Sequence, residues 1–582
     1  MATKTPISIS IPILDTLKNY SKAFFRHDLI AGVTVAAIAV PQAMAYAQLA
    51  GAPITMGLYG ALIAMIFFAI FTSTRQVMAG PDAALAALTG ASVLPLLGGA
   101  SDPGRAVALI SLFSILIGIA CIIALVGKLG FMSEFLSRPI LLGYMAGLAL
   151  AVIASQAPQL FGIDPVPGAN FFTSIAHILT NLSSANLPTV GLSLLLIGLS
   201  IGVLKYSKRV PLSLFLLIIS IALSSLLNLQ DSGVTVIGAI PSGLPIPTIP
   251  SISMLDIQAL FVPAAAVMLI SYANTIATAR SFAAKKNESI DSDQEFFALG
   301  TSNIVSGIFG GLPAAASGAR TAVATQSNSS TQVAQLLGAV AIGLVLLFFS
   351  PLLQTLPYAA LALIIIIAIS KLFNIKEMKS IWHAWRTEAG LAVVTVLGVT
   401  ILGIFQGLLL AIILAIANMI RTSAFPNDAE LGVAEDGSIR DMSRPPKTER
   451  IPGIIIYRFD APLYFSNANF FRRRILELTD SRKDIRWILW DAETITSIDS
   501  TAGAMLLNLI NELKERDVTF CIARMKGPIR HTINRTNRLS RVFRAIPHYS
   551  SMGDALSAFE NTPAAIDSKQ NNKKAHSVQS KT

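Results

Sequence analysis

Cysteine is scarce in this sequence of 582 residues, which contains only Cys121 and Cys521. Two cysteines so far apart offer neither a disulfide framework nor a paired-cysteine metal site. Charged residues are also few, at 13% of the chain, whereas 53% of the residues are hydrophobic. A soluble protein carries about twice that share of charge. The composition therefore indicates a polytopic membrane protein.

The sequence also lacks a basic patch and the usual signatures of enzymes. Up to Arg421 it has 20 Lys/Arg and 14 Asp/Glu, and from Thr422 onward it has 24 and 19. The positive charge is thus spread over both parts, which disfavours a nucleic-acid partner. No glycine-rich loop ends in Gly-Lys-Ser/Thr, and the six histidines are scattered. We expect no enzyme, no catalytic residues, no metal site and no cofactor beyond a possible coupling Na⁺ or H⁺.

Apolar windows long enough to cross about 30 Å of hydrocarbon recur between Leu29 and Ile420. We predict about fourteen segments in two halves of seven, joined by an external linker at residues 234–250, with an interfacial helix at 171–181. The third and tenth segments are too short or too interrupted by Gly and Pro to span alone. The segments are 29–48, 53–71, 81–98, 105–127, 134–157, 189–204, 210–229, 256–282, 295–310, 317–329, 331–350, 352–373, 387–404 and 406–421.

If successive segments cross the membrane in opposite directions, the loops rich in Lys and Arg all fall on one side. That side is the cytoplasmic one, because Lys and Arg are retained there. We therefore expect a multi-pass protein of the plasma (inner) membrane with both termini in the cytoplasm. The basic residues on that side are Lys18, Lys22, Arg26, Arg75, Lys128, Lys205, Lys208, Arg209, Lys285, Lys286, Lys371, Lys376, Lys379 and Arg421.

The last part of the chain alternates strand-like and helix-like runs, which predicts a small α/β domain with a mostly parallel sheet. The predicted strands are 454–459, 485–492 and 518–523, and the predicted helices are 469–478 and 503–515. The predicted domains are a cytoplasmic N-terminal segment (1–27), a transmembrane domain (28–421), a linker (422–452), the α/β domain (453–560) and a disordered tail (561–582).

Two Gly/Pro breaks open the third and tenth segments, at residues 78–84 and 310–320. In a bilayer such breaks are tolerated mainly where they line a cavity. Interrupted segments in matching positions indicate an inverted-repeat transporter whose substrate lies between two half-helix N-termini. Each N-terminus offers free N–H groups and partial positive charge, so two of them facing one cavity form an anion site.

Arg320 lies one turn into the second half-helix and would strengthen an anion site, because an ionisable residue at membrane depth usually marks a pathway. The alternatives are that Arg320 extends to the interface or pairs with Asp82 as a structural tie. Asp82 is at least as well explained as a helix cap. In the first segment Gln42 and Tyr46 share a helical face after Pro41. They are candidates to bind an oxyanion or, alternatively, to satisfy the backbone that the proline frees.

Several stretches together resemble the sulfate permease (SulP) family of anion transporters, with a C-terminal sulfate-transporter and anti-sigma-factor-antagonist (STAS) domain. They are residues 28–36 (DLIAGVTVA), 41–47 (PQAMAYA), 80–83 (GPDA), 293–313 (DQEFFALGTSNIVSGIFGGLP) and 491–503 (DAETITSIDSTAG). The resemblance implies two inverted repeats of seven segments, divided into core and gate domains, in a homodimer. It implies transport of sulfate, bicarbonate, another inorganic anion or a dicarboxylate.

The resemblance also implies a set of site residues. The anion-site positions fall on Gln42, Tyr46, Ala83, Ala84, Ser317, Gly318, Ala319 and Arg320. Two departures follow. The eighth-segment position that is often acidic in the family, where it is linked to proton or sodium coupling, is occupied by Asn274, which cannot titrate. The position before the arginine, which is a serine in the family, is occupied by Ala319. Asn274 leaves an uncoupled channel or exchanger open as an alternative, while Asn274 and Arg320 together disfavour a nucleobase permease.

The predicted STAS domain contains Asp499, Ser500 and Thr501 in the loop where signalling STAS proteins are phosphorylated. A phosphate there would meet a helix N-terminus. The simpler interpretation is that the three residues cap the helix expected from residue 503. As a module without an active site, this domain is expected to bind a regulatory protein. Arg472, Arg473 and Arg474 suggest either lipid or partner contact or, more simply, a solvated helix face.

Overall fold

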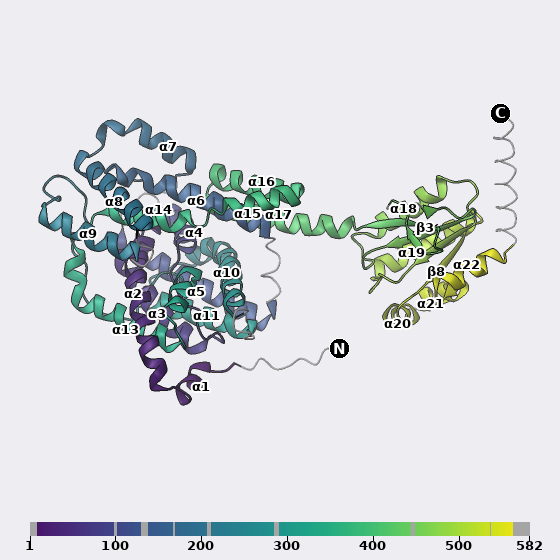
Figure 1. Cartoon of the computed structure of the whole chain (residues 1–582), viewed down its shortest axis with the longest axis horizontal. Coiled ribbons are helices and arrows are strands. Elements are labelled where there is room, and N and C mark those ends of the chain that lie inside the picture. Colours follow the sequence, from purple (N-terminus) through teal and green to yellow (C-terminus); the bar gives the residue numbers. More distant parts are fainter. Residues whose placement is uncertain are drawn as a thin grey trace. The chain divides into compact units, whose positions relative to one another are not determined.

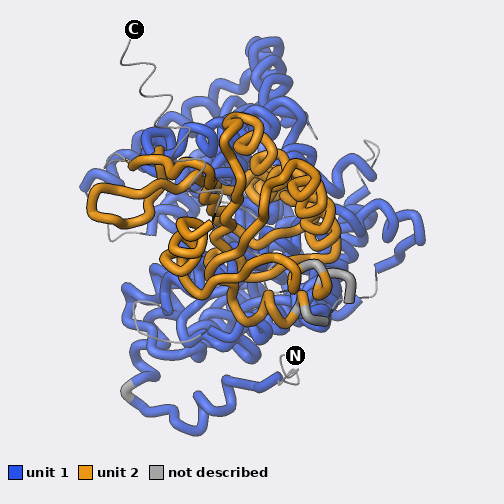
Figure 2. Tube along the Cα trace, turned by 90° about the vertical axis from the view of Figure 1, so that its right-hand side faces the viewer, with its two compact units in different colours: residues 1–415 blue, residues 416–582 orange. Residues whose placement is uncertain are grey.

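The computed structural model of the chain describes residues 9–97, 102–129, 138–166, 169–206, 211–248, 250–283, 290–443, 448–535 and 537–562. The chain forms two compact units, residues 1–415 and 416–582, which Figure 2 shows in different colours. The predicted disordered tail from residue 563 on lies outside the described residues, as do Lys208, Arg209, Lys285 and Lys286.

The first unit is a bundle of helices (Figure 1). Its first half contains α1 (Pro12–Lys18), α2 (Lys22–Leu49), α3 (Ile54–Phe71), β1 (Ala79–Gly80), α4 (Ala83–Val93), α5 (Pro103–Val126), α6 (Arg138–Leu160), α7 (Phe171–Thr180), α8 (Leu187–Tyr206) and α9 (Leu212–Leu226). Its second half contains α10 (Met254–Ala283), α11 (Ser292–Ile308), β2 (Ala315–Ala316), α12 (Gly318–Gln326), α13 (Val333–Leu344), α14 (Tyr358–Ser370), α15 (Ile375–Ala384), α16 (Arg386–Leu402) and α17 (Ile404–Ala424), the last of which continues into the second unit.

Each of the fourteen predicted segments overlaps one of these helices. Within the described part of the chain, nine helices are long and apolar enough to cross a membrane. The other five segments, α4, α9, α11, α12 and α16, are shorter than 18 residues. The helices α7 and α15 are short and amphipathic and lie between these segments, in corresponding places in the two halves.

The helices pack in two groups. In one, α5 lies along α11, α11 along α3, and α2 along α13 and α3. In the other, α6 lies along α16 and α14, and α14 also contacts α2 of the first group. Small residues let the helix backbones approach closely, as in other membrane bundles. A Cβ on Gly118 of α5, for example, would lie 2.6 Å from the carbonyl oxygen of Gly300 on α11.

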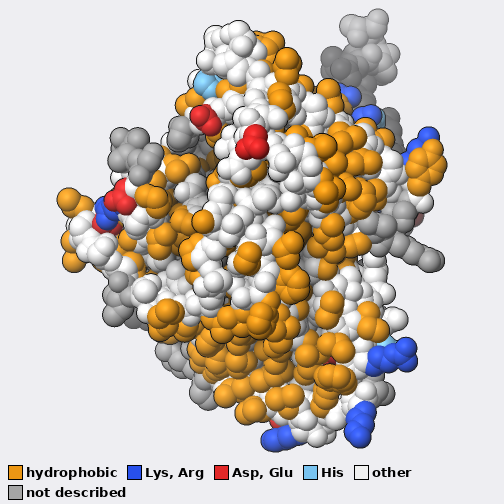
Figure 3. All heavy atoms as spheres, turned by 90° about the vertical axis from the view of Figure 1, so that its left-hand side faces the viewer, with side chains coloured by type: hydrophobic (Ala, Val, Ile, Leu, Met, Phe, Trp, Pro, Cys, Tyr) orange, Lys and Arg blue, Asp and Glu red, His pale blue; other side chains and the backbone are white. Residues whose placement is uncertain are grey.

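The outer surface of the first unit is rich in exposed hydrophobic side chains, as expected of a bundle that faces lipid. Figure 3 shows them covering a broad area of one face, with Lys and Arg near its edge. Large exposed hydrophobic side chains include Leu194, Leu195 and Ile201 on α8 and Phe348 and Phe349 after α13. This surface agrees with a polytopic membrane protein.

The second unit contains one seven-stranded sheet with helices on both faces (Figure 1). The strands are β3 (Asp428–Ala434), β4 (Ile439–Asp441), β5 (Thr448–Glu449), β6 (Ile454–Phe459), β7 (Trp487–Asp491), β8 (Thr519–Ala523) and β9 (His548–Tyr549), in the order β4-β3-β6-β7-β8-β9 with β5 beside β3. β6 to β9 are parallel, and β3 runs antiparallel to its neighbours. The helices are α18 (Ala468–Asp480), α19 (Ser500–Glu515), α20 (Gly527–Arg535), α21 (Asn537–Ala545) and α22 (Met552–Glu560).

The prediction of a linker at residues 422–452 is wrong. Its first three residues end α17, and its remainder contributes three strands, β3, β4 and β5, to the sheet of the second unit. β3 pairs with β6 from Asp428 opposite Phe459 to Leu431 opposite Ile456. Ala429 and Leu431 are buried on the face that α22 covers. The polar residues that suggested a linker alternate with these apolar ones along the strand, which is the pattern of an edge region with one buried face.

Candidate functional site

The two predicted half-helices begin from one pair of short strands. β1 pairs antiparallel with β2, so that Ala79 lies opposite Ala316 and Gly80 opposite Ala315. The helix α4 begins three residues after β1, and α12 begins two residues after β2. The two N-termini therefore start from a common point in the middle of the bundle.

Hydroxyl groups of neighbouring helices hold this strand pair. The backbone N–H of Ala316 donates to Thr275 Oγ1 of α10 at 3.2 Å, and that of Met78 donates to Thr321 Oγ1 of α12 at 3.0 Å. The backbone N–H of Ser317 donates to the carbonyl of Met78 at 2.8 Å. The irregular backbone at membrane depth is thus satisfied by protein groups, as it must be.

Each half-helix carries its own cap. Asp82 accepts a hydrogen bond from the N–H of Leu85 at 3.0 Å, and the Ser317 hydroxyl accepts one from the N–H of Arg320 at 3.4 Å. No hydrogen bond or close ion pair joins the described side chains of Asp82 and Arg320, although their charges interact electrostatically. Asp82 is therefore a helix cap that makes no direct contact with the guanidinium.

The guanidinium of Arg320 is the principal charged group at this point. The residue is 1% exposed, and its Nη2 donates to the carbonyl of Pro81 at 2.7 Å. Among the described residues, its Nε and Nη1 have no hydrogen-bond partner. The side chain is enclosed in the bundle and does not extend to an interface. An enclosed cation with free donors favours an anionic ligand.

Gln42 and Tyr46 lie on α2, which continues through Pro41. Tyr46 is buried and Gln42 is partly exposed. Neither side chain forms a hydrogen bond with another described residue, so neither satisfies the backbone that Pro41 frees. Both side chains keep their hydrogen-bonding capacity.

A cavity of about 960 Å³ opens beside these residues. Gln42 and Ala319 both line it, and Gly318 and Ala319 are exposed where α12 begins. Its walls come from α2, α8, α9, α12 and α14, and Lys371 lies at its edge. The cavity thus brings together one predicted residue of the first segment and one of the tenth, whereas Tyr46, Ser317, Gly318 and Arg320 are not among its lining residues.

Asn274 lies on α10, one residue before the Thr275 that supports β2. It is half-buried, and its side chain hydrogen-bonds to no other described residue. The amide is therefore close in sequence to the site scaffold but carries no charge that could titrate there.

In the second unit, α19 begins at Ser500 and not at residue 503. Asp499 is its N-cap and accepts from the N–H groups of Ala502 and Phe465, each at 2.7 Å. Ser500 and Thr501 lie exposed in the first turn, so the prediction that they help to cap the helix is wrong. Arg472, Arg473 and Arg474 pair with carboxylates of the same unit.

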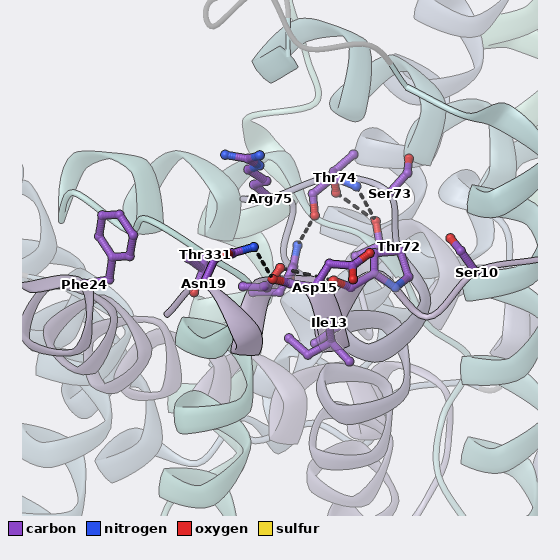
Figure 4. A pocket seen from close by; sticks show the side chains of 14 residues that line it. Ser10, Ile13, Asp15, Asn19, Phe24, Thr72, Ser73, Thr74, Arg75 and Thr331 are labelled. Carbon is purple, nitrogen blue, oxygen red and sulfur yellow. Dashed lines mark hydrogen bonds between the residues drawn. The ribbon is translucent and has the colours of Figure 1, made fainter. Parts of the chain in front are cut away.

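A second polar region was not predicted from the sequence. Helix α1 and the segments 72–75 and 331–332 line a pocket of about 330 Å³ (Figure 4). Beside it, the buried Asp28 accepts hydrogen bonds from Thr331 and from the N–H of Ser330. Buried Glu295 accepts from Thr72 and Ser73. Both carboxylates are fully hydrogen-bonded, which indicates a structural role for this region.

The sequence also gave no signal for the close fit between Gly80 and Arg320. A Cβ at Gly80 would lie 2.7 Å from Arg320 Nη1, and Gly80 has a φ of +153°. The glycine was visible in the 78–84 break, but its partner lies 240 positions away. No group of three or more metal-ligating side chains occurs within the described residues.

Comparison with known proteins identifies the family of this chain. Residues 25–395 match the model of the sulfate permease family, and residues 445–555 match that of the STAS domain. A probable sulfate transporter of Mycobacterium tuberculosis is 34% identical over 527 residues, which cover 90% of this chain and 94% of that protein.

Two solved structures share the fold. The murine solute carrier 26 family member A9 anion transporter matches 96% of this chain and 97% of its own with a TM-score of 0.87 at 20% identity. The transmembrane domain of the cyanobacterial bicarbonate transporter BicA matches 68% of this chain and 98% of its own with a TM-score of 0.60 at 24% identity. The relatives of this chain are transporters and not enzymes. The chain belongs to the sulfate permease family of multi-pass membrane transporters and carries a STAS domain near its C-terminal end.

Proposed function

We propose that this chain is a secondary transporter of small inorganic anions of the sulfate or bicarbonate class, working by alternating access. The anion lies between the N-termini of α4 and α12. The observation that carries the proposal is the enclosed guanidinium of Arg320, whose Nε and Nη1 have no partner among the described residues. A buried cation is stabilised when an anion accepts from its free donors.

The remaining site residues have distinct roles in this proposal. Ala83 and Ala84 supply backbone N–H groups of the first half-helix, and the first turn of the second supplies those of Gly318 and Ala319. Ser317 caps the second half-helix. On α2, the Gln42 amide and the Tyr46 hydroxyl donate to the anion from a third side. A planar or tetrahedral oxyanion satisfies donors arranged in this way.

Asn274 cannot exchange a proton or neutralise a cation, so coupling to Na⁺ or H⁺ requires another group. The same observation supports a second candidate function, an uncoupled anion channel or exchanger on this fold. A dicarboxylate substrate is a variant of the first candidate, because a carboxylate presents the same oxygens to Arg320.

We also infer the setting in which the transporter works. The chain forms a homodimer in the plasma (inner) membrane with both termini in the cytoplasm, as the distribution of Lys and Arg predicts. The STAS domain binds a regulatory protein. Ser500 and Thr501 are exposed in the first turn of α19, where phosphorylation would place negative charge at a helix N-terminus.

Uptake of labelled sulfate and bicarbonate into proteoliposomes of the purified chain tests this proposal, with sodium and proton gradients imposed separately. Saturable uptake driven by one gradient is the expected result. Uptake that does not saturate at millimolar anion and ignores both gradients would instead establish the channel. No uptake of either anion, in vesicles where the protein is folded and inserted, would contradict both candidates.

A further inference from the structure

A second cavity lies beside α4, one turn beyond its N-terminus. It has a volume of about 260 Å³ and is lined from α2, α4, α6 and the start of α17. Its polar lining consists of amides and a hydroxyl, with no charged residue among its described lining residues. These polar residues are Gln48, Ser155, Gln156, Gln159, Asn170 and Gln406.

The two cavities are lined by different levels of one shared helix, α2. Gln42 lines the large cavity and Gln48 lines the second, which places them about 9 Å apart along the axis of α2. On α4, the residues that line the second cavity begin at Ala87, one turn beyond Ala83. The buried Tyr46 therefore lies between the two lining positions on α2, and the α4 N-terminus lies one turn from the second cavity.

A hydrogen bond between two amides joins the helix groups at the second cavity. Gln48 Nε2 on α2 donates to Gln159 Oε1 on α6. Helix α2 packs in the group with α3 and α13, α6 packs in the group with α16, and α14 contacts both α2 and α6. Movement of one group against the other at this level has to break the bond.

Gln156 provides an unused polar group in the same cavity. It is 5% exposed, and its Oε1 has no hydrogen-bond partner among the described residues. Rotation of an amide by half a turn presents either its oxygen or its NH₂ group. A neutral amide can replace part of an anion's hydration shell, but it binds the anion less tightly than a guanidinium does. Such weak binding lets an anion enter and leave an intermediate site on a transport path.

We propose that this amide-lined cavity is the second vestibule of the anion path, on the membrane side opposite the large cavity, and that the Gln48–Gln159 hydrogen bond is the latch that holds it shut. The inference rests on the proposed anion path. It assigns Gln156 to contact the small oxyanion on that side, and it assigns Gln48 and Gln159 to control access.

Sided labelling of introduced cysteines tests the vestibule without measuring anions. Ser155→Cys reports on the second cavity and Ser327→Cys on the large one. Each variant is treated with a membrane-impermeant maleimide in intact cells and in broken cells. Cys121 and Cys521 are buried, so the parent chain serves as the blank. We expect the two cysteines to be reached from opposite sides, and labelling of both from one side would overturn the vestibule.

The latch is tested by adding Gln159→Leu to each reporter. Loss of one net hydrogen bond shifts a two-state equilibrium by about fivefold. We expect labelling at Ser155→Cys to accelerate by about that factor and labelling at Ser327→Cys to slow. The shortened Gln159→Asn should act in the same direction. Gln406→Leu is the matched control, because Gln406 lines the same cavity outside the pair.

Unchanged labelling in Gln159→Leu, in protein that elutes as a single folded species, would overturn the latch. Because labelling needs no anion, its failure is distinguishable from failure of the proposed function. Opposite-sided labelling without anion uptake would remove the anion path and leave two vestibules, whereas uptake with same-sided labelling would remove only the second vestibule.

Discussion

The Nη1 atom of Arg320 lies 2.7 Å from the position that a Cβ on Gly80 would occupy. Gly80→Ala must therefore displace the guanidinium, and it also strains a backbone at a φ of +153°. Displacing a positioned group by about 1 Å costs on the order of tenfold to a hundredfold in rate. We predict a loss of sulfate uptake in that range, measured in proteoliposomes.

Gly202→Ala is the matched control for this substitution. Gly202 lies in α8, and a Cβ there meets no atom within 4 Å. Uptake should stay within twofold of the parent chain. Normal uptake by Gly80→Ala would contradict the role given to the contact between Gly80 and Arg320.

Asp28 ties the start of α2 to the segment before α13. Its carboxylate accepts from the N–H groups of Ser330 and Thr331 at 2.7 and 3.1 Å and from Tyr20 at 3.0 Å. In Asp28→Asn some of these buried donors lose their acceptor, which costs about 1–3 kcal/mol of stability. We expect a lower midpoint of thermal unfolding in detergent.

Asp15→Asn provides the comparison for Asp28→Asn, because the Asp15 side chain is 81% exposed. An exposed carboxylate contributes little to stability, so its midpoint should match that of the parent. Equal midpoints for the two variants would show that the Asp28 contacts do not stabilise the fold.

The second unit depends on β3, which pairs with β6 along four residues. A fragment of residues 426–562 should fold and unfold cooperatively, whereas one of residues 453–562 exposes an edge of β6 and loses the buried Ala429 and Leu431. Circular dichroism during thermal unfolding distinguishes them. A cooperative transition of the shorter fragment at the same temperature would be inconsistent with the observed sheet.

Cys521 should resist alkylation in the folded chain. It lies in β8, and burial raises the pKa of its thiol to about 12. At pH 8 the reactive thiolate is therefore a very small fraction of the population. Mass spectrometry after maleimide treatment should find Cys521 unmodified in native protein and modified after denaturation. Rapid modification of the native protein would show that the thiol is accessible.

Much of the architecture could be predicted because its signals are local. Hydrophobic runs gave the helices, and the two Gly/Pro breaks gave the half-helices, since both depend on neighbouring residues. The pairing of Gly80 with Ala315 could not be predicted, because contacts between distant segments leave no local pattern. The same holds for Gln48 and Gln159. β3 was missed because its polar residues alternate with short apolar runs and resemble a linker.

Sulfate binding to the purified chain by isothermal titration calorimetry tests the central claim most directly, with Arg320→Ala beside Arg280→Ala. Arg280 is an exposed arginine on α10, so it controls for the loss of one positive charge. We predict that Arg320→Ala weakens binding by about tenfold or more and that Arg280→Ala leaves it unchanged. Equal affinities for the parent chain and Arg320→Ala would contradict an anion site between the N-termini of α4 and α12.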